Sequence, residues 1–200
     1  MKNPIVVLLL GMAACCLSAC GSPHKIKAEH RDPDWHGGQF KNILVIGIYD
    51  DRGLRISSES VFAAELTEQA VTASPSYDLI PDLETLADEE AVRKALDGTD
   101  YDAILTVMAL DGRGFDYSSW EAQYAFLRLL GGDGEGIKLW RNVDHLDAGA
   151  YILDVGLWDP KTLKPVWNAT TDLYSHERAS EGVKILADFM IKTLKERGLI

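Results

Sequence analysis

The sequence predicts an α/β fold, a three-layer or two-layer sandwich with the element order βαβαβββα. Two observations lead to this prediction. Apolar, β-branched runs alternate with segments of helical periodicity over residues 40–110, which is typical of parallel strands joined by helices. Two further strand-like runs, at 151–158 and 165–174, flank a short turn and precede a long helical pattern. They predict a mixed sheet that ends in an antiparallel hairpin and a helix.

The run at 43–49, Ile-Leu-Val-Ile-Gly-Ile-Tyr, is the central strand of this prediction. A strand with one face in water alternates apolar and polar residues, and this run does not. We therefore expect elements of the fold to cover both of its faces.

The next two elements are predicted to be a helix and a short strand. Ser57 or Ser58 is a suitable N-cap for the helix, and Pro75 is its expected end. Residues 77–80 then form the strand. The apolar face of the helix comprises Phe62, Leu66, Ala70 and Ala73.

A second helix is predicted to begin either with Thr85 and Asp88 as a capping pair or at Asp88 alone, and to end at Gly98. The apolar run at 101–110 is the strand that follows. The order up to this point is βαβαβ, which favours parallel pairing through right-handed crossovers. The last helix, over about 180–197, is expected to end at Gly198, with Leu199 as its hydrophobic cap contact.

The N-terminus predicts export and lipid attachment. Lys2 precedes a short apolar stretch, and residues 17–20 read Leu-Ser-Ala-Cys, so residues 1–19 are a predicted signal peptide. The sequence at 17–20 resembles the lipobox of bacterial lipoproteins, in which the cysteine is acylated, for example with palmitate. The resemblance implies Cys20 as the lipidation site. Gly21 is not the aspartate that resembles an inner-membrane retention signal. We therefore expect a location on the periplasmic face of the outer membrane.

Residues 20–39 carry prolines, glycines and charges with almost no apolar periodicity, so they are a predicted flexible tether. Residues 40–200 then form a single α/β domain with an insertion at 111–148. With Cys20 modified and Cys15 and Cys16 removed with the signal peptide, the domain has no thiol and therefore no disulfide or thiolate metal site.

The insertion is the most informative surface of the predicted domain. It combines glycine-rich segments with several aromatic residues, a residue class enriched at binding hot spots. The alternative is that these side chains cover the edge of the sheet or fill the core. The candidate partner-binding residues are Tyr117, Trp120, Tyr124 and Phe126.

The charge excludes one class of partner. The chain has 31 acidic and 20 basic side chains and a net charge of −11, so nucleic acid is not an expected partner. The expected partners are an envelope protein or a second copy of this chain, together with the membrane reached through the lipid anchor.

Three aspartates are weak candidates for a metal site. Asp50 and Asp51 follow the strand at 43–49, and Asp111 follows the strand at 101–110, so all three are expected at the carboxyl edge of the parallel strands. The alternative is that they are solvated turn residues. No nucleophile elbow, zinc-protease motif or phosphate-binding loop is present, and we predict neither a cofactor nor an enzymatic activity.

The chain also resembles a group of envelope proteins. The strand at 43–49, the Tyr-Asp-Ala-Ile-Leu start of the strand at 101, and the spacing from Asp159 through Thr162 to Trp167 carry the resemblance. The group includes the amino-terminal domain of TolB, the curli secretion lipoprotein and lipoproteins that activate penicillin-binding proteins. It implies a non-catalytic binding or assembly role. Two alternatives remain open, which are a metal-dependent hydrolase using the three aspartates and a ring-forming subunit of a secretion or export apparatus.

Overall fold

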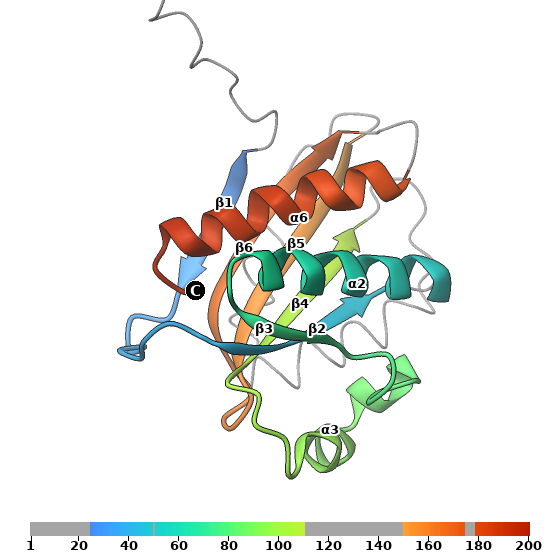
Figure 1. Ribbon diagram of the computed structural model, residues 1–200, viewed down its shortest axis with the longest axis vertical. Coiled ribbons are helices and arrows are strands. Elements are labelled where there is room, and N and C mark those ends of the chain that lie inside the picture. The colour runs from blue at the N-terminus through green and yellow to red at the C-terminus, as the bar shows by residue number, and fades with distance from the viewer. Residues whose placement is uncertain (1–24, 50, 111–149, 175–178) are drawn as a thin grey trace, which may run out of the picture.

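The computed structural model describes residues 25–49, 51–110, 150–174 and 179–200. These residues form a mixed sheet with helices on its faces (Figure 1). The elements are β1 (Ile26–Arg31), β2 (Asn42–Ile48), α2 (Arg52–Glu68), β3 (Thr72–Pro75), η1 (Leu83–Ala87, a 3₁₀ helix), α3 (Glu89–Leu96), β4 (Ala103–Leu110), β5 (Ala150–Asp159), β6 (Lys164–Tyr174) and α6 (Ala179–Glu196).

The sheet has six strands in the order β1-β6-β5-β4-β2-β3. β2 pairs in parallel with both β3 and β4, whereas β4–β5, β5–β6 and β6–β1 are antiparallel. From β2 onward the order of strands and α-helices is βαβαβββα, so the predicted fold class is confirmed. The predicted C-terminal hairpin and helix are β5, β6 and α6.

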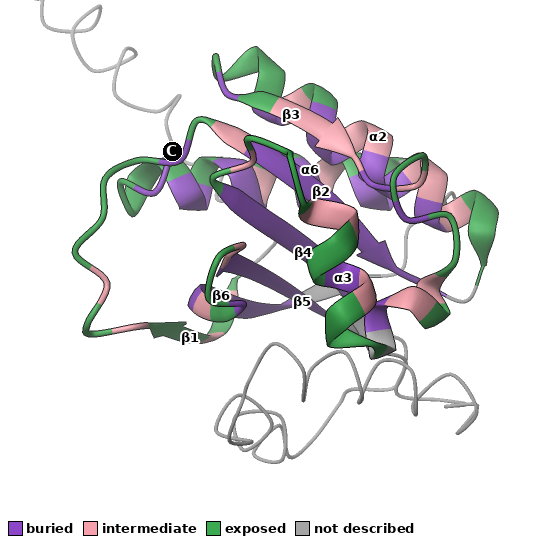
Figure 2. Cartoon of the chain, turned by 90° about the horizontal axis from the view of Figure 1, so that it is seen from below, coloured by how far each residue is buried: buried purple, intermediate pink, exposed green. Residues whose placement is uncertain are grey.

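β2 is buried on both sides, as its unbroken apolar sequence predicts. Ile43 and Val45 face a core shared with α2 and α6, which lie side by side on one face of the sheet (Figure 1). We call this the helix face. Leu44 and Ile46 point the other way, into a second core with residues of η1 and α3. The buried strands between these layers are visible in Figure 2.

The first helix and the strand after it differ from the prediction. α2 begins at Arg52, because Asp51 is the N-cap and its carboxylate accepts a hydrogen bond from the Leu54 amide at 2.6 Å. The helix ends at Glu68, followed by Ala70 at a φ of +62°. The chain then enters β3 instead of remaining helical to Pro75. The expected strand at 77–80 is a turn, in which the amides of Leu79 and Ile80 donate to the Ser76 carbonyl.

The two later helices follow their predicted boundaries. Asp88 caps α3, and its carboxylate accepts from the amides of Glu90 and Ala91. After α6, Gly198 has a φ of +67° and Leu199 is fully buried. The Leu199 amide donates to the Leu194 carbonyl at 3.0 Å, and the Gly198 amide donates to that of Lys195. These two bonds form the helix-ending motif that a C′ glycine permits.

The prediction of a flexible tether is wrong for Ile26–Arg31, which form the edge strand β1. Apolar and polar residues alternate in β1 only at Ile26 and Ala28, which are partly buried, so the signal is too short to stand out from the polar sequence around it. Its backbone pairs with β6, with a bulge between Ile26 and Ala28. Residues 1–24, including Cys20, lie outside the described part of the chain.

Candidate functional site

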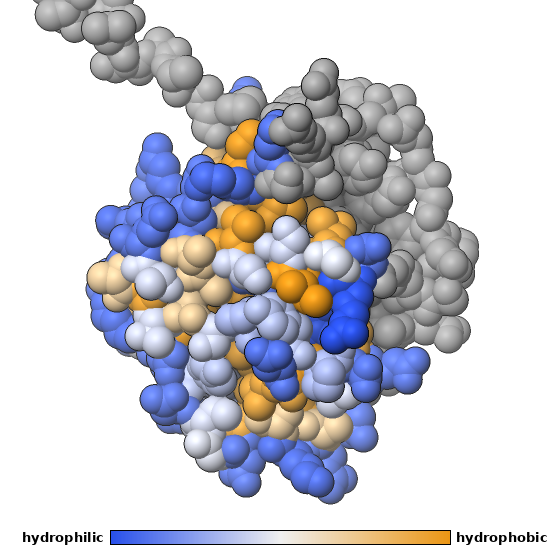
Figure 3. All heavy atoms as spheres, turned by 45° about the vertical axis from the view of Figure 1, so that its right-hand side comes forward, coloured by the Kyte–Doolittle hydropathy of each residue, from blue (hydrophilic) through white to orange (hydrophobic). Residues whose placement is uncertain are grey.

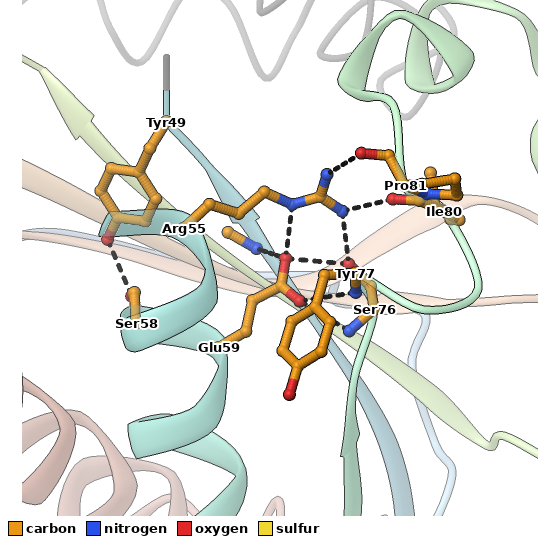
Figure 4. A network of polar contacts seen from close by, with 9 residues as sticks. Tyr49, Arg55, Ser58, Glu59, Ser76, Tyr77, Ile80 and Pro81 are labelled. Atoms are coloured by element: carbon orange, nitrogen blue, oxygen red, sulfur yellow. Dashed lines mark hydrogen bonds and ion pairs between the residues drawn. The ribbon is translucent and has the colours of Figure 1, made fainter. Parts of the chain in front are cut away.

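The most strongly built polar site lies beside the end of β2, where α2 approaches the turn after β3 (Figure 4). Its centre is the carboxylate of Glu59, which is fully buried. One oxygen, Oε1, accepts from the Gly47 amide at 2.9 Å and from the Ser76 hydroxyl at 2.9 Å. The other, Oε2, accepts from the amides of Ser76 at 2.7 Å and Tyr77 at 2.9 Å. Three backbone amides therefore converge on one carboxylate.

Arg55 completes the site from one helical turn earlier on α2. Its Nε donates to Glu59 Oε1 at 2.8 Å, and the pair is almost completely shielded from water, with side-chain exposures of 3% and 0%. The two terminal nitrogens of the guanidinium donate to the carbonyls of Ile80 and Pro81 and to the Ser76 hydroxyl. The ion pair thus ties α2 to the whole turn at 76–81.

The local sequence explains why this site forms. Residues 55 and 59 are four apart, so both side chains lie on one face of α2. Glycine at position 47 favours the close approach, because a Cβ atom there would lie 3.2 Å from the Glu59 Cγ and 3.1 Å from the Tyr49 ring, and these side chains would have to shift by a few tenths of an ångström. Sequence analysis missed this site. The available signal was two opposite charges at i and i+4 on a helix face that also carries Phe62.

The polar atoms of the Arg55 and Glu59 side chains are all hydrogen-bonded within the protein. In open α/β sheets, ligands bind beyond the carboxyl ends of the parallel strands, and here a side chain of the protein itself lies at that position. Each oxygen of Glu59 and each nitrogen of the Arg55 side chain has a partner within the protein. Nearby, the Tyr49 hydroxyl lies 3.1 Å from the Ser58 hydroxyl, and burial raises the pKa of Tyr49 to about 12. The tyrosine is therefore neutral at physiological pH.

Of the three candidate metal-binding aspartates, the structure describes only Asp51. Its carboxylate caps α2. Asp50 and Asp111 lie outside the described residues. Within residues 25–49, 51–110, 150–174 and 179–200, no group of three or more histidine, cysteine or acidic side chains is arranged to hold a metal ion.

The other predicted site residues also lie outside the described part of the chain. This holds for Cys20 and for the four aromatic candidates Tyr117, Trp120, Tyr124 and Phe126. The strands that flank the insertion meet at one edge of the sheet, where β4 stops at Leu110 and β5 starts at Ala150.

A second buried acid escaped sequence analysis. Asp154 lies on β5 on the face of the sheet opposite the helix face, and it is 5% exposed. Burial raises the pKa of Asp154 to about 8, while a hydrogen bond with Asn168 acts in the opposite direction. On the same face, the Trp158 indole donates to the Thr106 hydroxyl at 2.8 Å. The signal was a single acid within the apolar run at 151–158.

A third polar cluster fastens the N-terminal strand to the C-terminal helix. Both oxygens of Glu29 on β1 accept from Arg197, Oε1 from Nε at 2.6 Å and Oε2 from a terminal nitrogen at 2.7 Å. The Trp167 indole also donates to Glu29, at 2.8 Å. These hydrogen bonds and the positive charge of Arg197 lower the pKa of Glu29. We call this cluster the β1 clamp.

The exposed surface is mostly polar. Among the described large hydrophobic residues only Leu79 is exposed, at 37%. Hydrophilic side chains surround the hydrophobic ones on the face in Figure 3. In the described segments no helix has the length and apolarity needed to span a bilayer.

Comparison with known proteins yields solved structures only. No protein-family model and no curated protein sequence matches the chain. It is similar to two PelC dodecamers from Paraburkholderia phytofirmans. The first, a variant, has a TM-score of 0.44 and 14% identity over 84% of this chain and 96% of that one. The second has a TM-score of 0.46 and 13% identity over 88% and 99%. The lipoprotein GNA1162 from Neisseria meningitidis is also similar, with a TM-score of 0.42 and 12% identity over 78% and 99%.

Proposed function

We propose that this protein is a lipid-anchored binding or assembly module of the bacterial envelope, held on the periplasmic face of the outer membrane and without catalytic activity. The observation that carries the proposal is the Leu-Ser-Ala-Cys sequence at 17–20, followed after only five intervening residues by a strand that is part of the folded domain. An acylated Cys20 would therefore hold the domain directly above the membrane surface.

The lipid anchor would act by confining the domain to a thin layer next to the membrane. More than one acyl chain gives durable anchoring where one does not. A domain held in a thin layer above the membrane meets partners in that layer at a raised effective concentration. Binding then needs only modest contact energy between the domain and its partner.

The buried polar groups support a structural use of the described domain. Glu59 and Arg55 bond to the protein's own backbone and side chains, so this charged pair is engaged in holding α2 to the sheet. The candidate contact surface is the insertion at 111–148 with its aromatic residues.

Two variants test the proposal. Replacing Cys20 with serine should move the protein from the membrane fraction to the soluble periplasmic fraction without changing its far-UV circular dichroism. Cross-linking and pull-down of the acylated protein should recover one envelope component or a second copy of the chain, and Trp120→Ala should abolish that recovery with folding intact. Retention of the Cys20→Ser protein in the membrane, or a bound divalent metal lost in Asp51→Ala with turnover of a substrate, would contradict the proposal.

A further inference from the structure

The position of β1 limits how far the domain can stand from its anchor. Lys25, the first described residue, is five positions after Cys20, and a fully extended chain spans about 18 Å over five positions. The tether is therefore much shorter than the 20 residues that the sequence alone suggested.

β1 cannot extend this reach by detaching easily. Its backbone pairs with β6, and the Thr171 hydroxyl donates to the Lys25 carbonyl at 3.0 Å, at the beginning of the strand. The β1 clamp holds Glu29 to Arg197 and Trp167. The amino end of β1 is thus a fixed point on the domain surface.

The ends of the strands form two opposite edges of the sheet, and this fixed point lies at one of them. β1, β6, β5 and β4 pair in antiparallel fashion one after another, so β1 begins at the edge where β4 and β2 end. The hairpin turn between β5 and β6 lies at the opposite edge. α3 is also at that opposite edge, because the Arg93 guanidinium donates to the Lys161 carbonyl in the hairpin turn. Figure 1 shows β1 beginning at the upper end of the domain and α3 at its lower end.

Charge is distributed unevenly between these two edges. Residues 88–102, which include α3 and lead into β4, carry six acidic and two basic side chains, a net charge of −4 against −11 for the whole chain. We call them the acidic arm. At the other end, the side chains of Lys25, directly before β1, and Lys27, within it, are exposed. The one acid of the strand, Glu29, is neutralised by Arg197 in the β1 clamp.

We propose, on the basis of the lipid-anchored function above, that the sheet edge where β1 begins faces the membrane. Lys25 and Lys27 contact anionic lipid phosphates in the leaflet that holds the acyl chains, and the acidic arm points away from the bilayer. Lysines near an anionic surface are attracted to it individually, while the same surface repels the acidic arm. The short tether and the charge distribution thus favour the same orientation. Lys25 should favour it by about fivefold, and Lys27, which also interacts within the protein, adds to this preference.

Fluorescence energy transfer from the acidic arm to a headgroup-labelled lipid tests this orientation. All three cysteines lie at or before position 20, so Lys94→Cys on α3 supplies a unique labelling site in the acylated protein. Material shown by its mass to be acylated is placed on vesicles of phosphatidylcholine with or without phosphatidylglycerol. We expect lower transfer on the anionic vesicles, because the acidic arm is then held away from the surface.

Lys25→Glu with Lys27→Glu should raise transfer on anionic vesicles to the value seen on phosphatidylcholine alone. The matched control is Lys161→Glu with Lys192→Glu, which changes the net charge equally at exposed positions away from β1 and should leave transfer low. A second measurement avoids variants altogether. In 1 M salt, where charges are screened beyond about 3 Å, the unmodified protein should lose its preference for anionic vesicles.

Equal transfer on both vesicle types, or no effect of the Lys25 and Lys27 changes, would overturn the orientation while leaving the anchor in place. A chain that carries no acyl group and does not associate with vesicles would instead contradict the proposed function itself.

Discussion

Removing the carboxylate of Glu59 should be among the most destabilising single changes in the described domain. Glu59→Ala leaves the Arg55 guanidinium buried without its charge partner, and it leaves the amides of Gly47 and Tyr77 without an acceptor. Removing one member of a buried ion pair costs about 3–5 kcal/mol, and each orphaned buried donor adds about 1–3 kcal/mol. The total, about 5–11 kcal/mol, is comparable with the 5–15 kcal/mol by which a typical domain is stable.

The partners of the pair predict an asymmetry. In Arg55→Met the Glu59 carboxylate keeps its three backbone amides and the Ser76 hydroxyl, so its charge remains well solvated by the protein. We therefore expect Arg55→Met to cost clearly less than Glu59→Ala. Glu59→Gln should fall between them, because one carboxylate oxygen becomes an amide nitrogen that faces donors.

Urea unfolding of the Cys20→Ser chain at pH 7, followed by tryptophan fluorescence and circular dichroism, measures these differences. Unchanged m-values would show that the unfolded states remain comparable. Formate should stabilise Glu59→Ala more than it stabilises the parent chain at equal ionic strength, because it restores an anion to the vacated position. A cost below about 1 kcal/mol for Glu59→Ala, or a larger cost for Arg55→Met, would refute the reasoning.

Three further predictions concern other parts of the fold. The folded chain holds the Asp154 proton up to a pKa of about 8, whereas 3.8 is the ordinary value. This residue therefore makes the free energy of unfolding fall by about 1.4 kcal/mol per pH unit between about pH 4 and 8, and Asp154→Asn should remove that slope. Ala70→Gly should stabilise the chain by about 1 kcal/mol, because residue 70 has a φ of +62°. Glu29→Ala should speed hydrogen exchange at the β1 amides and leave that of β2 nearly unchanged.

Each of these predictions has its own control. Unfolding measured from pH 4 to 8 should give parallel curves for the parent chain and Asp154→Asn if the account of this acid is wrong. Gly198→Ala, at a φ of +67°, should lose about the stability that Ala70→Gly gains. Lys192→Ala removes a more exposed ion pair, with Glu196, and should leave β1 protected. Equal exchange rates in Glu29→Ala and the parent chain would show that the β1 clamp does not secure the strand.

The sequence predicts an element of the fold correctly wherever its local pattern and its tertiary environment agree. The unbroken apolar run of β2 requires cover on both faces, and two faces of the sheet provide it. Gly198 followed by Leu199 predicts the end of α6, because the signal depends on a few neighbouring residues.

Sequence reasoning failed where distant residues decide the structure. β1 is a strand because β6 offers it an edge and because Arg197, 168 positions away, binds Glu29. The sequence Ile-Lys-Ala-Glu-His-Arg contains no trace of either partner. The apolar pattern of α2 continues through Ala73, yet the chain turns at Ala70 and enters β3, where pairing with β2 overrides helix propensity.

In the candidate site, too, the sequence predicts what depends on neighbouring residues and misses what depends on distant ones. The sequence pattern predicts Asp51 as an acid at a strand tip, but its position directly before the first turn of α2 makes it the N-cap. The Glu59 site was not predicted, because three of its donors are backbone amides, which carry no residue-specific signal.

The most direct test of the central claim is the intact mass of the protein extracted from membranes with detergent. We expect a chain that begins at Cys20 and carries the added mass of its acyl groups. An unmodified thiol at position 20, or a mature chain that begins beyond it, would show that the domain is not held at the membrane by this residue.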